Sequence, residues 1–171
     1  PTEDEMAEAL ELTADEYERI PVAPASLDAI VLSHGHFDHV GGLEEVLEQA
    51  RHAALHLHPR ACEAKFSGSG GTSRRISTPF VERRGFTGDR RAVIETVEPH
   101  EVVPGLWCTG EIPRGNDFED TGGPFYLDSG LTRPDPLHDD MALFFQAREG
   151  TVVILGCAHA GLVNTLDHVA R

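Results

Sequence analysis

The feature that most constrains this chain of 171 residues is a cluster of three histidines and one aspartate at residues 34–39, with the sequence HGHFDH. An apolar run rich in β-branched residues, at 28–32, precedes the cluster directly and predicts a buried strand. Residues 43–51 follow it with amphipathic spacing and predict a helix. The cluster therefore lies in a loop that leaves a strand and enters a helix.

The spacing within this cluster predicts a metal site. Because residues i and i+2 of an extended segment point the same way, His34 and His36 can bind one metal together. Asp38 and His39 come where the chain turns towards the helix, so their side chains can reach a second ion beside the first. Imidazole and carboxylate groups suit Zn²⁺, and also Fe or Mn²⁺. The alternative interpretation is a cluster of surface histidines without a ligand.

The charge of the chain narrows the class of partner. The 29 acidic residues outnumber the 14 basic ones, which gives a formal net charge of −15. Such a chain repels phosphate backbones, so nucleic acid and anionic membranes are disfavoured as partners. No apolar run approaches the ~20 residues that a membrane-spanning helix needs. A small-molecule substrate is therefore the expected partner, and the oligomeric state stays open.

Cysteine and lysine content give two further expectations. The three cysteines, Cys62, Cys108 and Cys157, form no CxxC pair, which favours free thiols in a reducing cytosol and a cytoplasmic location. Lys65 is the single lysine, and all the other basic residues are arginines. An acidic surface poor in lysine is typical of salt-adapted proteins, although high-GC coding gives the same composition.

The remaining pattern predicts one domain over residues 1–171, in which strands and helices alternate and sheets are covered by helices. Helical spacing is expected at 2–20 and 161–171. Residues 67–88 are rich in Gly, Ser and Arg, without clear periodicity, and predict a long flexible loop or lid. Further strands are expected at 53–58, 92–97, 101–109, 141–147 and 151–155.

An HxHxDH motif after an apolar strand resembles the metallo-β-lactamase fold superfamily. Four segments resemble the branch that includes the dihydropterin–ribofuranosylaminobenzene-phosphate synthase of methanopterin biosynthesis and many metallo-hydrolases. They are LSHGHFDHVGGL at 32–43, PGLWCTGEIPR at 104–114, DDMAL at 139–143 and GCAHAGLVNTL at 156–166. The resemblance implies an α+β protein with α/β-type layers, an αββα four-layer sandwich. Family members usually also have an N-terminal pair of strands and a late Gly-Gly-Phe-His segment, so a chain incomplete at both ends is expected.

The resemblance also assigns ligands. It implies that His34 and His36 bind the first metal together with His159, which follows a later strand. Asp38 and His39 would bind the second metal, and Asp38 would also be the catalytic residue that orients the nucleophile.

Three further residues are candidates near these metals. Cys157 is either a zinc ligand or a buried structural thiol. Asp140 is a candidate bridging carboxylate, whereas Asp139 is expected to orient a neighbour. His100 and His138 are weaker candidates for metal contact.

The function expected from these residues is that of a metal-dependent hydrolase. Two divalent cations, zinc in the first instance, would activate a water that attacks a small, anionic ester, phosphate or lactone. A pterin transferase of the methanopterin-pathway type is one alternative, and a non-catalytic metal-binding relic is another. The sequence contains no GxSxG motif, which would have indicated a serine nucleophile. Four arginines near the predicted loop are either an anion-binding group or part of a solvated loop: Arg74, Arg75, Arg83 and Arg84.

Overall fold

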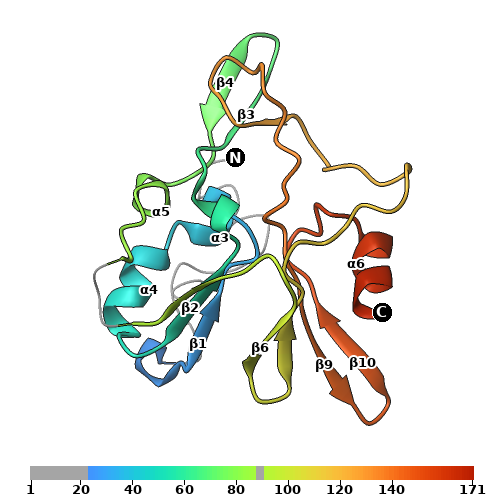
Figure 1. Cartoon of the computed structure of the whole chain (residues 1–171). Coiled ribbons are helices and arrows are strands. Elements are labelled where there is room, and N and C mark those ends of the chain that lie inside the picture. The colour runs from blue at the N-terminus through green and yellow to red at the C-terminus, as the bar shows by residue number, and fades with distance from the viewer. Residues whose placement is uncertain (1–22, 88–90) are drawn as a thin grey trace, which may run out of the picture.

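The computed structural model describes residues 23–87 and 91–171, and its strands form three sheets (Figure 1). The first sheet is parallel, in the order β1-β2-β5. Its members are β1 (Ala29–Val31), β2 (Ala54–Leu57) and β5 (Val93–Glu95). These three strands confirm the predictions at 28–32, 53–58 and 92–97. The helix expected at 2–20 lies outside the described residues.

Short helices pack with this sheet and close a hydrophobic core. After the 3₁₀ turn η1 (Pro24–Ser26), they are α3 (Phe37–Val40), α4 (Leu43–Gln49), η2 (Pro59–Cys62) and α5 (Pro79–Glu82). Leu55 and Leu57 of β2 are fully buried in this core, together with Val40, Leu47 and Val81 from the helices. The core holds the strand end that carries the histidine cluster, because β1 pairs with β2 along its whole length.

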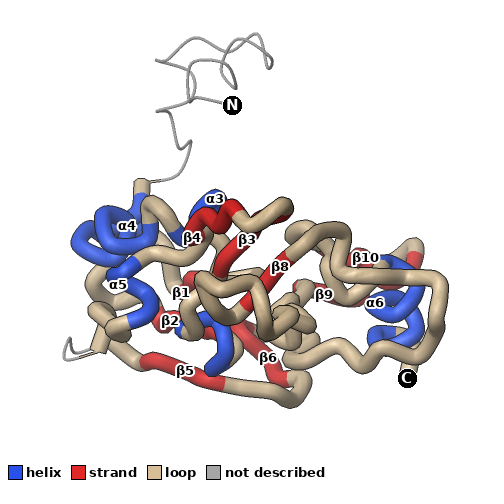
Figure 2. Tube along the Cα trace, turned by 90° about the horizontal axis from the view of Figure 1, so that it is seen from above, coloured by secondary structure: helices blue, strands red, loops and turns tan. Residues whose placement is uncertain are grey.

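The second sheet is antiparallel, in the order β10-β9-β7-β6. Its strands are β6 (His100–Val103), β7 (Leu106–Cys108), β9 (Leu143–Ala147) and β10 (Gly150–Ile154), and α6 (Leu162–Val169) follows them. The single strand predicted at 101–109 is wrong, because a turn at Gly105, with φ +85°, divides it into a hairpin. Figure 2 shows this sheet and α6 at the opposite end of the molecule from α4.

The third sheet corrects the prediction of an irregular loop at 67–88. It contains β3 (Phe66–Ser69), β4 (Thr72–Arg75) and the short β8 (Phe125–Tyr126). The hairpin turns at two glycines, Gly70 and Gly71, whose positive φ angles other residues rarely adopt. Ile76 and Phe86 near this hairpin are buried, so the segment has a core that its sparse apolar residues do not reveal. Its flexibility stays a prediction.

Two observations concern the chain as a whole. All three cysteines are free thiols, as predicted. Within the described residues, no helix has the length and apolar character needed to cross a membrane.

Candidate metal centre

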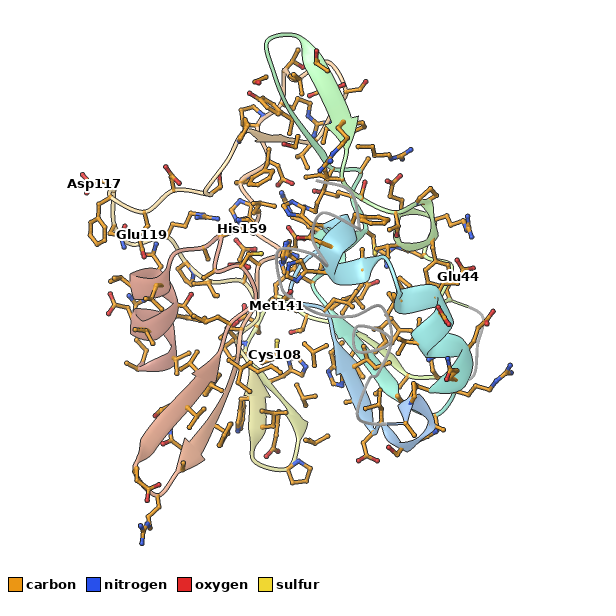
Figure 3. All side chains as sticks on the ribbon, turned by 180° about the vertical axis from the view of Figure 1, so that it is seen from behind. Glu44, Cys108, Asp117, Glu119, Met141 and His159 are labelled. Carbon is orange, nitrogen blue, oxygen red and sulfur yellow. The ribbon has the colours of Figure 1, made fainter. Side chains whose placement is uncertain are left out.

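Three histidines from distant parts of the chain converge beyond the ends of β1 and β10. His34 follows β1, His36 immediately precedes α3, and His159 follows β10. One ring nitrogen of each lies within 4.8 Å of those of the other two. Figure 3 shows His159 near the middle of the molecule, between α6 and α3. The structure thus brings together the three residues that the sequence assigns to the first metal.

The polar atoms of this group fit a cation. The Nε2 atoms of His34, His36 and His159 are buried and have no hydrogen-bond partner among the described residues. Leaving a buried polar atom unpaired costs about 1–3 kcal/mol, so three such atoms gathered at one point indicate a missing common partner. Three imidazole nitrogens are a frequent protein donor set for zinc.

Hydrogen bonds at the other ring nitrogen select the tautomer that a metal requires. His159 Nδ1 donates to the carbonyl oxygen of Thr121 at 2.7 Å, which leaves Nε2 with a free electron pair. Ser33 Oγ lies 3.2 Å from Nδ1 of His34 and 3.1 Å from Nδ1 of His39. Because a hydroxyl oxygen can accept two hydrogen bonds, Ser33 can orient both rings with Nε2 towards the site.

The electrostatics of the site keep these rings neutral. Burial lowers the pKa of His34 to about 2, and repulsion from the neighbouring histidines, His36 first, adds to the effect. Burial lowers the pKa of His36 to about 4, with a further contribution from His159. Neutral imidazole is the form that binds a metal, so both rings are ready to act as ligands at neutral pH.

A second group of candidate ligands adjoins the first. His39 Nε2 lies 3.1 Å from Cys157 Sγ, and these two residues form a potential metal-binding group with His34. Partial desolvation raises the pKa of the Cys157 thiol, but the residue is exposed, so the expectation of a buried structural thiol is wrong. Asp38 stands at the edge of this group: its Oδ2 is 3.6 Å from His39 Nε2 and its side chain is 70 % exposed. The structure thus brings Cys157 closer to His39 than the predicted ligand Asp38.

Two adjacent aspartates reach the site from the segment before β9. Asp140 accepts a hydrogen bond from the Ala160 amide at 2.7 Å through Oδ2, whereas its Oδ1 is buried without a partner. Burial raises the pKa of Asp140. Asp139 accepts a hydrogen bond from the Gly35 amide at 2.8 Å, inside the histidine cluster. Asp140 therefore has an oxygen free for a ligand role, and Asp139 contacts the motif backbone.

The weaker histidine candidates are occupied elsewhere. His100 Nε2 lies 2.8 Å from Nδ1 of His56, and the two rings are stacked. His138 Nδ1 lies 2.8 Å from Glu111. Within the described part of the chain, neither belongs to a group of three potential ligands.

Most of the candidate anion-binding arginines are also engaged. Three of them form ion pairs with glutamates: Arg75 with Glu82, Arg83 with Glu44 and Arg84 with Glu95. Arg74 lies exposed on β4. The arrangement favours the solvated-loop interpretation for the three paired arginines.

Two features that the sequence did not single out shape the surroundings of the metal site. The ring of Phe125 lies 4.8 Å from that of His36 and 5.2 Å from that of His159, and forms an aromatic wall. An open cleft of about 270 Å³, with mostly apolar walls, ends beside Ser33 and His39. A small molecule can therefore approach the second group of ligands through this cleft.

Comparisons with known proteins agree with this geometry. The family model of the metallo-beta-lactamase superfamily matches residues 1–169. The 7,8-dihydropterin-6-methyl-4-(β-D-ribofuranosyl)-aminobenzene-5′-phosphate synthase of Methanocaldococcus jannaschii is 29 % identical over 153 residues, which are 84 % of this chain and 50 % of the synthase. An uncharacterised protein of the same organism is 28 % identical over 145 residues, 82 % of this chain and 52 % of that protein.

A solved structure supports the fold. The crystal structure of Tm1679, a metal-dependent hydrolase of the β-lactamase superfamily, matches with a TM-score of 0.65 and 27 % identity. The match covers 84 % of this chain and 51 % of that one. The chain therefore spans about half the length of the relatives it matches. The mixed α+β fold is confirmed, and the chain belongs to the metallo-β-lactamase superfamily.

Proposed function

We propose that this chain carries the metal-binding part of a metal-dependent hydrolase. His34, His36 and His159 would hold one divalent cation, zinc in the first instance. The observation that carries this proposal is the convergence of the three histidines, each with one ring nitrogen within 4.8 Å of those of the others and each with a buried Nε2 that lacks a hydrogen-bond partner among the described residues. The hydrolase Tm1679 supports the same reaction class.

His39, Asp38 and Cys157 would hold a second cation beside the first. His39 and Cys157 support this role because their ligand atoms lie near each other and near His34. Asp140 Oδ1 is buried and unpaired, which suits a carboxylate shared between two ions. Asp38 would join this group from its edge, where its exposed carboxylate lies 3.6 Å from His39.

Bound divalent cations supply Lewis acidity and bring the pKa of water towards neutrality. The residues of the chain supply the rest of the chemistry. Asp38 is free to orient the attacking water or accept its proton, because its carboxylate is exposed to the open side of the site. Phe125, whose ring lies against those of His36 and His159, would shield one side of them from water. We propose a small anionic ester, phosphate or lactone as the substrate.

A synthase is the second candidate function. It is supported by the 29 % identity to the pterin-pathway synthase of M. jannaschii. The aromatic ring of Phe125 beside the candidate ligands also offers a planar surface for an aromatic substrate. Parallel assays with the same metal-loaded protein separate the two candidates: ester or lactone turnover supports the hydrolase, and pterin coupling without it supports the synthase.

The metal assignment is tested by elemental analysis of wild-type protein, His36→Ala and the control His52→Ala. His52 is exposed and lies outside both ligand groups. We expect wild type and His52→Ala to retain zinc after dialysis and His36→Ala to lose it. Equal zinc in His36→Ala would contradict the assignment. Less than one zinc per chain in wild type, with no turnover, would favour a non-catalytic relic.

A further inference from the structure

The only lysine of the chain is buried behind the metal centre. Lys65, at the start of the third sheet, has 1 % of its surface exposed. Its Nζ donates to Asp135 Oδ2 at 2.9 Å and to Asp139 Oδ1 at 2.8 Å. Both aspartates are themselves buried. A chain whose other Lys/Arg residues are all arginines therefore keeps its one lysine in an interior ion-pair network.

One arm of this network reaches the histidine cluster. Asp139 uses Oδ1 for Lys65 and Oδ2 for the backbone amide of Gly35, at 2.8 Å. Gly35 lies between His34 and His36 in the sequence, so two consecutive hydrogen bonds join the lysine to the backbone that carries both ligands. Hydrogen bonds to an ionised group are shorter and stronger than neutral ones, which makes this link a firm one.

The opposite side of Gly35 is closed as well. A Cβ atom at this position would lie 2.2 Å from the carbonyl oxygen of Ala61 in η2. The backbone of the cluster is thus held between η2 on one side and Asp139 on the other. Because His34 and His36 flank the held residue, a shift of Gly35 would move both ligand rings.

The charges of the network suit a neighbouring cation. Burial alone would lower the pKa of Lys65, but the attraction of Asp139 and Asp135 outweighs it, and the pKa is raised. The pKa of Asp139 is lowered: burial acts in the opposite direction, and the charge of Lys65 overcomes it. Two carboxylates share one ammonium, so the network retains negative charge next to imidazoles that carry none.

We propose that Lys65 and Asp139 are positioning residues, which fix the segment from His34 to His36 in the geometry that binds the metal. Lys65 would hold the Asp139 side chain, and Asp139 would hold the Gly35 amide. Asp135 shares the lysine but makes no contact with the histidine cluster among the described residues, and its other oxygen accepts from the Leu137 amide. This proposal rests on the proposed function, because it assumes that His34 and His36 are ligands.

The two aspartates provide a matched pair of variants. Asp139→Asn and Asp135→Asn each remove one carboxylate from the same ammonium, and only the first alters the contact to Gly35. The readouts are the visible spectrum of bound Co²⁺ and the dissociation constant for zinc, measured against a chelator. We expect Asp139→Asn to weaken zinc binding about 10- to 100-fold and to change the Co²⁺ spectrum, as mutations behind metal ligands do. Asp135→Asn should leave the spectrum unchanged and the affinity within about threefold.

Lys65→Met tests the lysine itself and should reproduce the Asp139→Asn spectrum. Thermal unfolding of the metal-free variants shows which of them fold. If Lys65→Met does not fold, the comparison of Asp139→Asn with Asp135→Asn tests the proposal alone. Equal effects of the two aspartate variants, or a native spectrum in Asp139→Asn, would overturn the proposal. If that happens while His36→Ala still loses zinc, the positioning proposal fails and the metal assignment stands. If His36→Ala retains zinc, the metal assignment itself fails.

Discussion

The two halves of the molecule differ in how well they are packed. In the half built on β1, β2 and β5, Leu55 and Leu57 are completely buried under short helices. In the half built on β9, β10 and α6, Ile154 is 50 % exposed and Leu166 is 46 % exposed. Both halves contribute candidate ligands, since His36 belongs to the first half and His159 to the second. One side of the metal centre is therefore supported by a large closed core, whereas the other is supported by a small buried cluster and a few polar contacts.

Six exposed apolar side chains of the second half lie on β10, just after it, and on α6. We call this set the bare face: Val152, Ile154, Leu155, Leu162, Val163 and Leu166. Polar contacts, which we call the polar tethers, also hold this half together. Arg114 donates to the carbonyl oxygens of His159 and Pro136, at 2.7 and 2.5 Å, and Glu119 accepts from the first amides of α6. These tethers, together with the small buried cluster of Ile112, Ala142 and Ala160, hold His159 in place.

The largest effect is expected from a substitution in the closed half. Leu55→Ala removes a side chain that is fully buried in the core. We expect it to lower the free energy of unfolding by about 2–5 kcal/mol, because a cavity adds to the lost burial. Urea unfolding of the metal-free protein measures this. A loss below about 1 kcal/mol would mean that the first half is not the better packed one.

The next largest effect is expected on the free energy of unfolding at acidic pH, because His34 and His36 are buried where the two halves meet. Histidine in the unfolded chain titrates near pH 6.5, whereas His36 and His34 titrate at about 4 and about 2 in the folded protein. As the pH falls below 6.5, the unfolded chain takes up protons that the folded one does not, so stability decreases. We expect a slope of up to about 1.4 kcal/mol per pH unit for each histidine. Urea unfolding of the metal-free protein between pH 7 and 5 measures this slope. A free energy of unfolding that does not change with pH would contradict the burial of these rings.

A tether of the second half should matter for metal affinity. Arg114→Lys replaces a guanidinium that bridges two carbonyls with a single ammonium that cannot reproduce both contacts. We expect zinc to bind about tenfold more weakly, because His159 loses its support. Arg148→Lys is the control, since Arg148 is exposed and pairs with its neighbour Glu149, its one ion-pair partner in the described ranges 23–87 and 91–171. Equal affinities for wild type and Arg114→Lys would show that His159 is held by other contacts.

The smallest effect is expected on the bare face. Leu166→Ala shortens a side chain that is nearly half exposed, so the free energy of unfolding should change by no more than about 0.5 kcal/mol. The loss in free energy of unfolding for Leu55→Ala, measured under the same conditions, shows how much better the first half is packed than the second. A loss near 2 kcal/mol would show that the bare face is covered in the protein in solution.

Much of the site was predictable because its residues form a compact pattern. The HGHFDH spacing and the strand before it indicate how His34 and His36 meet, and the family resemblance adds His159. The relation of Cys157 to His39 was left open, since it depends on how a later loop returns to the first half. The tautomer of His159 is set by the backbone carbonyl of Thr121, which no side-chain pattern can reveal.

The fold was less predictable where the apolar pattern is weak. The hairpin β3–β4 contains mostly Gly, Ser, Thr and Arg, and its pairing comes from the backbone and from the turn at Gly70 and Gly71. In the sequence, Lys65 was notable only because it is the single lysine of the chain. Its importance in the structure depends on two aspartates 70 and 74 residues away, a separation that no local pattern reports.

The central claim is that the buried imidazoles of His34, His36 and His159 share one divalent cation. Anomalous diffraction at the zinc edge, from crystals grown with zinc, tests this most directly. We expect an anomalous peak about 2.0–2.1 Å from the Nε2 atoms of all three histidines. Saturating zinc with no peak at this point, or with a peak only at other residues, would contradict it.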